Sequence, residues 1–388
     1  MKSKSNFLFF VALVFSAYSC SQKGDGSVSE VIVNGNKMYV FSLNDLKSDT
    51  TTIPLSKLVD YCVLVQLENT EEAYFKPGVT TVTEKYIAVR SSRAPYKLFS
   101  RSGKFIGNIG SVGNGPGEWT FSLYDDIIDD KNDLIYLSSL NSDKILVYNT
   151  SGQFLKNFVA PHRLQKPKMF LFNEVLTVIH MPFEDNKAFA YQFDVKTGEI
   201  LNEFAPPPAH FIEQGFDGEL ISMRNAPNTF DFLHTNSDTL YHFDTKNNKI
   251  LPVFRVTYNT SEQIWKRYLP FNKNIYLTNV SILSEELRKY VSVGMVATDL
   301  DSKISSWIKV TNDFYGNMPV SIGNASNGYW ISNVQPEQLI EYIENHLANR
   351  GISEKDKQIL NKTLATLQEN TNNVVFIGKL KDKVQKLW

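Results

Sequence analysis

The glycine-rich run at residues 106–119 comes nearest in this chain to a known chemistry, the binding of phosphate. A P-loop cradles phosphate with backbone N–H groups and ends in Gly-Lys-Ser or Gly-Lys-Thr, an ending that this run lacks. Gly110 and Gly113 have the spacing of a dinucleotide loop, but no helical pattern follows them, as that loop requires. The run therefore predicts a tight crossover between repeated units, with Glu118 accepting backbone N–H groups and Trp119 packing between the units.

A cluster of aspartates at residues 125–133 raises the possibility of a calcium site. An EF-hand loop needs a Gly at its turn and a Glu at its end, and both are missing here. Strand alternation would put Asp125 and Asp126 on opposite faces of a sheet. We therefore expect solvated side chains at a turn and at strand ends, from Asp125, Asp126, Asp129, Asp130 and Asp133.

The remaining signals of metal or nucleophilic chemistry are poor. The six His form no H-E-x-x-H motif, and the sequence contains no C-x-x-C and no G-x-S-x-G. Cys62 lies in an apolar run and is expected to be a small buried hydrophobic residue. The sequence thus predicts no catalytic residue, no metal ligand and no cofactor. An enzyme of lactonase, lyase or glycosidase type stays open, because isolated polar residues could still converge in the fold.

Aromatic residues are abundant, with 26 Phe, 18 Tyr and 5 Trp, which suggests stacking on sugars. Most of them stand in strand-like runs, where packing is their ordinary use. Trp265 and Arg267, in an expected loop at residues 261–270, are the better candidates for an exposed recognition surface, because loops on a rigid scaffold often carry function. Together with Trp119 they are the predicted binding residues.

A repeated hairpin pattern indicates the elements that would position such residues. Each copy consists of an aromatic residue, a few turn residues, Gly or Asn, and an apolar pair. The copies start at Phe99, Tyr148, Phe193 and Phe243, which are separated by 49, 45 and 50 residues. Gly or Asn supplies the positive φ of a tight turn, and the period is that of propeller blades. Weaker copies at residues 298–304 and 376–381 bring the count to six blades. Seven are possible if residues 38–66 form a blade of their own.

The pattern changes to a helical one near the C-terminus. Residues 335–371 show apolar spacing of three and four, a Pro at a first helical turn, and a capping pattern from Ser353 to Asp356. We predict a helical hairpin inserted before the last strand, which either packs on the propeller or docks a partner. The last strand, Val374–Ile377, is expected to close the ring by pairing with an N-terminal strand.

The N-terminus predicts export. Lys2 and Lys4 precede 11 mostly apolar residues, Phe7–Ala17, which would rise only about 16 Å as a helix and so could not span a bilayer. The sequence before Cys20 resembles a bacterial lipobox, so we expect a signal peptide at 1–19, a lipid-anchored tether at 20–36 and the propeller at 37–388. An incidental Cys after an ordinary secretory signal is the alternative. Only the lipid would contact the membrane.

Charge excludes one class of partner. The formal net charge is −1, or −3 without Lys2 and Lys4, and the basic residues are dispersed rather than grouped in a block. Nucleic acid is therefore not an expected partner.

Several strings resemble a known family. The run Gly113-Asn-Gly115-Pro-Gly117-Glu118 resembles the G-x-G-P-G-E signature of six-bladed β-propeller lipoproteins of gut-type Gram-negative bacteria, which are distantly similar to NHL-repeat propellers. Residues 236–241 and 369–381 are similar to two further parts of that family, although Val374 stands where the family often has Pro. The resemblance spans about residues 63–381 and implies an exported, lipid-anchored propeller without an agreed activity.

We therefore expect an all-β, six-bladed β-propeller with a helical hairpin inserted before the last strand. Its predicted function is non-enzymatic binding of a glycan, peptide or protein partner, at the outer membrane, on its periplasmic side or the cell surface. The alternatives are a propeller enzyme with a polar axial site and a structural interaction module. Clustered Asp, His and Arg on one face would favour the enzyme, and an aromatic-rimmed face would favour binding.

Overall fold

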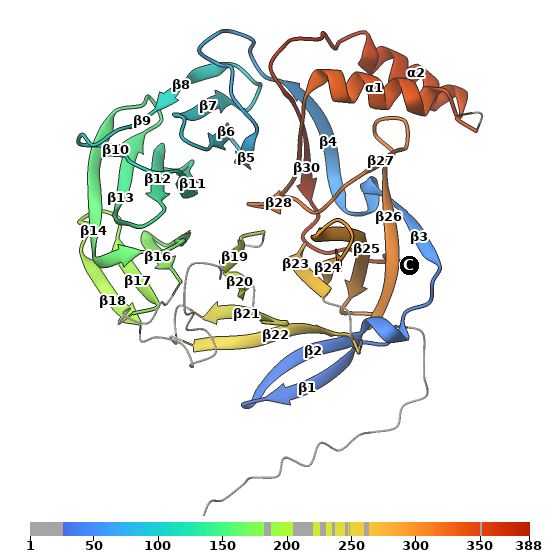
Figure 1. Ribbon diagram of the computed structural model, residues 1–388, viewed down its shortest axis with the longest axis horizontal. Helices are drawn as coiled ribbons and strands as arrows, with labels where there is room; N and C mark the ends of the chain where they lie inside the picture. Colours follow the sequence, from blue (N-terminus) through green and yellow to red (C-terminus); the bar gives the residue numbers. More distant parts are fainter. Residues whose placement is uncertain are drawn as a thin grey trace, which may run out of the picture.

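Six small sheets stand in a ring around a central axis (Figure 1), and their strands are antiparallel except where β2 (Asn36–Ser42) and β3 (Thr50–Pro54) add parallel to two of them. This computed structural model describes residues 26–181, 188–204, 220–225, 230–234, 237–244, 247, 249–259, 264–349 and 351–388. The predicted all-β, six-bladed propeller is confirmed. Cys20 and the signal peptide lie outside the described residues. We number the sheets as blades 1 to 6 along the chain.

Blades 1 to 3 each have four strands that follow one another in the sequence. Blade 1 consists of β5 (Gly78–Val82), β6 (Tyr86–Ser91), β7 (Tyr96–Ser100) and β8 (Phe105–Ile109). Blade 2 consists of β11 (Leu123–Asp129), β12 (Leu134–Ser139), β13 (Ser142–Asn149) and β14 (Phe154–Leu164). Blade 3 consists of β15 (Lys168–Phe172), β16 (Val175–Ile179), β17 (Ala190–Asp194) and β18 (Ile200–Phe204).

Blades 4 and 5 also take strands from the N-terminal part of the chain. Blade 4 consists of β19 (Leu220–Met223), β20 (Asp231–His234), β21 (Thr239–Asp244) and β22 (Lys249–Thr257), extended by β2 (Asn36–Ser42) and β1 (Ser29–Val33). Blade 5 consists of β23 (Ile264–Pro270), β24 (Ile275–Ser284), β25 (Lys289–Asp299) and β26 (Ile304–Asn312), with β27 (Met318–Val320) and β3 (Thr50–Pro54) paired to β26.

Blade 6 closes the ring with strands from both ends of the chain. It consists of β28 (Ala325–Ser326), β29 (Tyr329–Val334), β30 (Val374–Leu380) and β4 (Val59–Gln66). The predicted pairing of the last strand with an N-terminal strand is confirmed, since β30 lies between β29 and β4. The seven-blade alternative is wrong, because residues 38–66 contribute β2, β3 and β4 to three different blades.

The repeated hairpin is the turn between the third and fourth strands of a blade. Gly103 and Gly152 have φ of 91° and 90°, the positive values that we predicted. The aromatic residue before each turn is almost wholly covered, as Phe99 and Phe193 show with 0% exposure. The proposed copy at residues 376–381 is not a hairpin. It is the third strand of blade 6, and its fourth strand, β4, comes from the other end of the chain.

The glycine-rich run forms the crossover between blades 1 and 2, as predicted, and contains the short parallel pair β9 (Ser111–Val112) and β10 (Glu118–Trp119). Glu118 accepts hydrogen bonds from Gly115 N at 2.7 Å and from Ser111 Oγ at 2.9 Å, and these bonds lower the pKa of its carboxyl group. Gly113 N donates to Trp119 O. These amide groups are occupied within the loop, which removes the argument for phosphate binding there.

The fold begins earlier than the sequence indicated. Val28 is 5% exposed within the largest core cluster, and β1 pairs with β2. Residues 26–36 therefore belong to the folded domain instead of the tether, because the β-branched residues of β1 form a hairpin with β2. Two short 3₁₀ helices, η1 (Leu43–Asp45) and η2 (Leu55–Lys57), connect these N-terminal strands.

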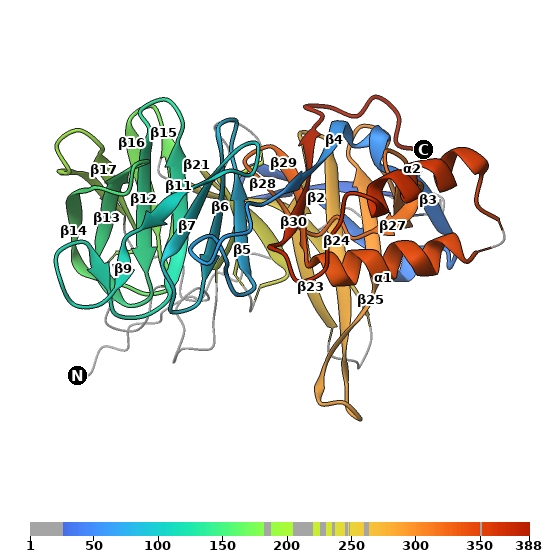
Figure 2. The same ribbon diagram turned by 90° about the horizontal axis from the view of Figure 1, so that it is seen from above.

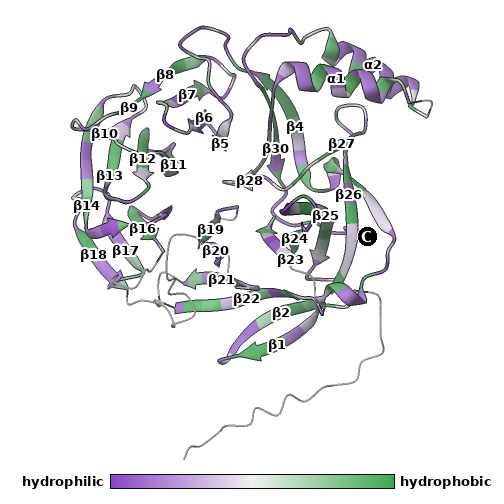
Figure 3. Cartoon of the chain, in the orientation of Figure 1, coloured by the Kyte–Doolittle hydropathy of each residue, from purple (hydrophilic) through white to green (hydrophobic). Residues whose placement is uncertain are grey.

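The predicted helical hairpin comprises α1 (Pro336–Leu347) and α2 (Glu354–Leu364), with Ser353 Oγ capping α2 at Asp356 N. Both helices carry hydrophobic and hydrophilic residues (Figure 3). Their apolar side chains Leu339, Ile343 and Leu360 belong to the core cluster of blades 4 to 6. Within the described chain, no helix is long and apolar enough to cross a membrane.

The core is divided among the interfaces between blades. One cluster joins blades 1 and 2, another joins blades 2 and 3, and others follow around the ring. Each blade therefore depends on its two neighbours for burial, and the ring must close for every interface to be covered.

Candidate functional site

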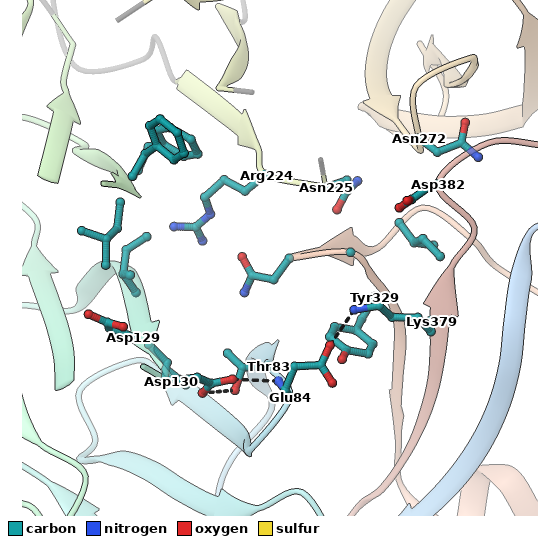
Figure 4. Close-up of a pocket in the computed structure, with 18 of the residues that line it drawn as sticks. Thr83, Glu84, Asp129, Asp130, Arg224, Asn225, Asn272, Tyr329, Lys379 and Asp382 are labelled. Atoms are coloured by element: carbon teal, nitrogen blue, oxygen red, sulfur yellow. Dashed lines mark hydrogen bonds and ion pairs between the residues drawn. The ribbon is translucent and has the colours of Figure 1, made fainter. Parts of the chain in front are cut away.

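A cavity of about 550 Å³ lies at the axis, on one face of the propeller (Figure 4). All six blades contribute to it, mostly through the turns or strand ends that follow their first strands. Its polar and charged lining residues are Thr83, Glu84, Asp129, Asp130, Arg224, Asn225, Asn272, Lys273, Asn327, Tyr329, Lys379, Lys381 and Asp382.

Arg224 connects three blades at the edge of this cavity. It follows β19 in blade 4, and its side chain is only 11% exposed. The guanidinium donates to Asp125 Oδ2 of blade 2 at 3.3 Å and to Met169 O of blade 3 at 3.0 Å. The charge of Arg224 is therefore already balanced by Asp125, and its hydrogen bonds connect blades 2, 3 and 4.

Asp126 is the centre of a second buried network. Its carboxylate, 1% exposed, accepts hydrogen bonds from Arg90 Nε at 3.0 Å and from Tyr96 Oη at 2.9 Å, both in blade 1. Burial raises the pKa of Asp126, but the positive charges of Arg90 and Arg224 oppose it, and the pKa is lowered overall. Burial and the nearby carboxylate raise the pKa of Tyr96.

These two networks correct part of the prediction for the aspartate cluster. Asp125 and Asp126 do lie on opposite faces of β11, toward blades 3 and 1, as alternation requires. Our expectation that they are solvated is wrong, because each is buried against an arginine from another blade. Asp129 does bind turn amides, accepting from Lys131 N at 3.1 Å.

Three of the four carboxylates that line the cavity, those of Glu84, Asp129 and Asp130, are also engaged. Asp130 accepts from Thr83 Oγ1 at 2.7 Å and from Glu84 N at 2.9 Å (Figure 4). Glu84 pairs with Lys379 Nζ at 2.7 Å, and this bond lowers the pKa of Glu84. Lys379 also lies over the ring of Tyr329, 4.3 Å from its centroid. The acidic side of the cavity is thus held in place by bonds within the protein.

Three asparagines add neutral polar groups from blades 4, 5 and 6. Asn225 Nδ2 donates to Pro270 O at 2.8 Å, which orients the amide and leaves its buried Oδ1 without a partner in the described chain. Asn327 Nδ2 donates to Val82 O at 3.3 Å. Asn272 Nδ2 donates to Lys381 O, and Asn272 Oδ1 accepts from Ile275 N. Asn225, a lining residue, therefore carries a buried acceptor, Oδ1, that has no partner in the described chain.

One wall of the cavity is apolar. Phe170 and Phe172 stand on the same face of β15 and stack at 6.4 Å with an interplanar angle of 20°. Phe172 is 37% exposed and lines the cavity. Ile127, Ile128 and Leu171 complete this wall.

The predicted binding residues lie elsewhere. Trp119 is 3% exposed in the core between blades 1 and 2, where it packs as we predicted for the crossover. Trp265 and Arg267 share one face of β23, a strand where we had expected a loop. Trp265 contacts Tyr290 at 6.1 Å on the β24–β25 hairpin, which projects beyond the ring (Figure 2). The axial cavity includes none of these three residues, and their binding role stays a prediction.

Sequence reasoning missed the residues of the cavity, although a signal existed. Thr83, Asp130, Asn272 and Asn327 occupy the turn after the first strand of blades 1, 2, 5 and 6. A search for polar residues directly after the first strand of each blade would have identified the face of the propeller that carries the cavity. Arg224 carries no local pattern, because its partners are about 100 and 55 residues away along the chain.

The described lining residues include no His, Cys or Ser, and the described chain contains no group of three potential His, Cys, Asp or Glu metal ligands. Cys62 is 8% exposed in β4, as expected of a small core residue, and burial raises the pKa of its thiol to about 12. The arrangement is suited to holding a small polar molecule against an apolar wall.

The fold and this cavity define a six-bladed β-propeller with a polar axial pocket. The chain belongs to the family described as a domain of unknown function (DUF4934), whose model matches residues 38–379. No curated protein is similar to it.

Two solved structures from Bacteroides are similar to this chain, and the first has a similar fold. One is a "putative exported protein" of Bacteroides fragilis NCTC 9343, with 15% identity and a TM-score of 0.59, covering 88% of this chain and 99% of its own. The other is a member of the DUF4221 family from Bacteroides vulgatus ATCC 8482, with 13% identity and a TM-score of 0.47, covering 84% and 98%.

Proposed function

We propose that this protein is an exported, lipid-anchored propeller that binds a small polar ligand, such as the end of a glycan or peptide, in its axial pocket without transforming it. The observation that carries the proposal is the convergence of all six blades on one cavity of about 550 Å³, a volume typical of small-molecule sites. A rigid ring that presents turns to a common pocket is a usual platform for recognition.

The state of the polar groups supports binding over catalysis. A general acid or base must be free to exchange a proton with a substrate, and a nucleophile needs a base beside it. Asp130 accepts three hydrogen bonds from the turn between β5 and β6, Glu84 is paired with Lys379, and Arg224 is paired with Asp125. Phe172 adds one exposed aromatic side chain, which supports binding, and the described lining combines Asp and Arg without the His that the enzyme criterion also required.

The test is binding followed by recovery of the ligand. We expect one or more members of a set of neutral sugars, acidic sugars, amino acids and dipeptides to raise the unfolding temperature of the purified protein. A ligand at about 100 times its Kd stabilises the native state by about 2.7 kcal/mol. The bound compound should be recovered chemically intact after long incubation, as NMR would show. Turnover of any member that depends on Asp129 or Asp130 would establish the enzyme alternative instead.

The lipid anchor is tested separately. Cys20→Ser removes the thiol that a lipid would modify, so we expect the protein to move from the membrane fraction to the soluble fraction. Its unfolding temperature should stay unchanged, because the described core begins only at residues 26–28. Unchanged membrane partitioning of the variant would remove the lipoprotein assignment and leave export alone.

A further inference from the structure

We infer that the axial pocket takes a neutral sugar of one or two rings, stacked on Phe172 and held by the oxygen atoms of Asn225 and Asn327. This inference rests on the proposed function and adds the chemical class of the ligand. Three properties of the pocket carry it: its balanced charge, its unused hydrogen-bonding groups and its exposed aromatic wall.

The charge of the lining favours a neutral ligand. Four acidic residues (Glu84, Asp129, Asp130, Asp382) and four basic ones (Arg224, Lys273, Lys379, Lys381) line the pocket, so the formal charges of the lining cancel, and the sum is only −1 when Asp125, the partner of Arg224, is included. Two of the four cations are in ion pairs, Arg224 with Asp125 and Lys379 with Glu84, and Lys381 Nζ donates to Ser56 O at 2.7 Å. A charged ligand inside the pocket would compete with these bonds, whereas a neutral one would leave them intact.

The unused hydrogen-bonding groups of the lining include the Oδ1 atoms of Asn225 and Asn327, which accept, and the hydroxyl of Tyr329, which donates or accepts. Hydroxyl groups of a ligand can bond to all three. The Nδ2 atoms of Asn225 and Asn327 are occupied by backbone carbonyls, so their orientation is set and the Oδ1 atoms remain. The Oδ1 of Asn225 is buried without a partner in the described chain, a state that costs free energy until a donor arrives. Hydroxyl groups around a sugar ring are such donors.

The apolar wall fits the other surface of a sugar. The faces of a sugar ring carry C–H groups, and these pack on aromatic rings. Phe172 offers such a ring at 37% exposure, and its stacking on Phe170 holds it in one orientation.

The experiment is titration calorimetry of the purified protein with maltose, cellobiose, N,N′-diacetylchitobiose and galactose. Glycylglycine and glucuronic acid serve as charged probes. We expect saturable binding of at least one neutral sugar at concentrations up to about 10 mM. Phe172→Ala should weaken it at least about tenfold. The matched control is Phe121→Ala, since Phe121 is 51% exposed on the crossover and does not line this pocket.

Each result decides between the two proposals. Binding of glycylglycine or glucuronic acid but of no neutral sugar, with loss in Phe172→Ala, would keep the axial pocket as the binding site and overturn the sugar. Equal sugar affinity in the wild type and Phe172→Ala would also overturn it, because the wall would not be the contact. Absence of binding by every probe would overturn both proposals.

Discussion

Arg90→Ala is expected to lower the free energy of unfolding by about 3–5 kcal/mol, the usual cost of removing one partner of a buried ion pair. The guanidinium, 12% exposed, donates to the 1% exposed carboxylate of Asp126 and to Leu123 O across the interface of blades 1 and 2. Without it, Asp126 keeps a buried charge that Arg224 only partly balances. Urea denaturation followed by fluorescence measures the change.

Lys85→Ala is the matched control. Lys85 and Asp133 connect the same two blades at a similar distance, 2.9 Å, but both side chains are about half exposed. Water screens such a pair, so its removal should barely move the denaturation midpoint. Equal effects of the two substitutions would contradict our interpretation that burial makes the Arg90 pair important.

The same network predicts how stability depends on pH. The pKa of Asp126 is lowered from the ordinary aspartate value of 3.8, so its contribution is fully present above that value and is lost as pH falls through the folded pKa. In Arg90→Ala the effect of burial, which raises the pKa, is less opposed. Acid unfolding of the variant should therefore begin at a higher pH than that of the wild type.

Local spacing was enough to predict the blades, because each hairpin depends on a few neighbouring residues. The φ of Gly103 and the covered ring of Phe99 follow from a turn and an alternation within eight residues. The copy at Phe376 failed for a physical reason. The strand contains an aromatic and several apolar residues, as other third strands do, but its partner β4 lies more than 300 residues away along the chain.

The candidate site shows the limit of such reasoning more clearly. The sequence identified Asp125 and Asp126 as part of an acidic cluster, and it correctly predicted that their side chains lie on opposite faces of the strand. Their burial was missed because the two arginines that permit it stand in other blades, at positions 90 and 224. Asn225 and Phe172 likewise become a pocket only when blades 3 and 4 meet at the axis.

Deletion of all residues after Asn373 is expected to have the largest effect, the loss of soluble monomer. The deletion removes β30, which pairs with β29 on one side and with β4 on the other. Both neighbours would then present unpaired strand edges, which associate readily with other chains. The core clusters on either side of blade 6 would also be opened to water, since Val374, Val375 and Ile377 belong to them.

Deletion of the helical hairpin is the contrasting variant. Val334 and Val374 are paired neighbours in the sheet, so an Asn-Gly linker in place of residues 336–370 can join β29 to β30. We expect this variant to remain a monomer with a closed ring. Its stability should fall, because Leu339, Ile343 and Leu360 no longer cover their neighbours in the core. Size-exclusion chromatography with light scattering compares the two. A monomeric tail deletion beside an aggregated hairpin deletion would mean that α1 and α2, rather than β30, hold the ring together.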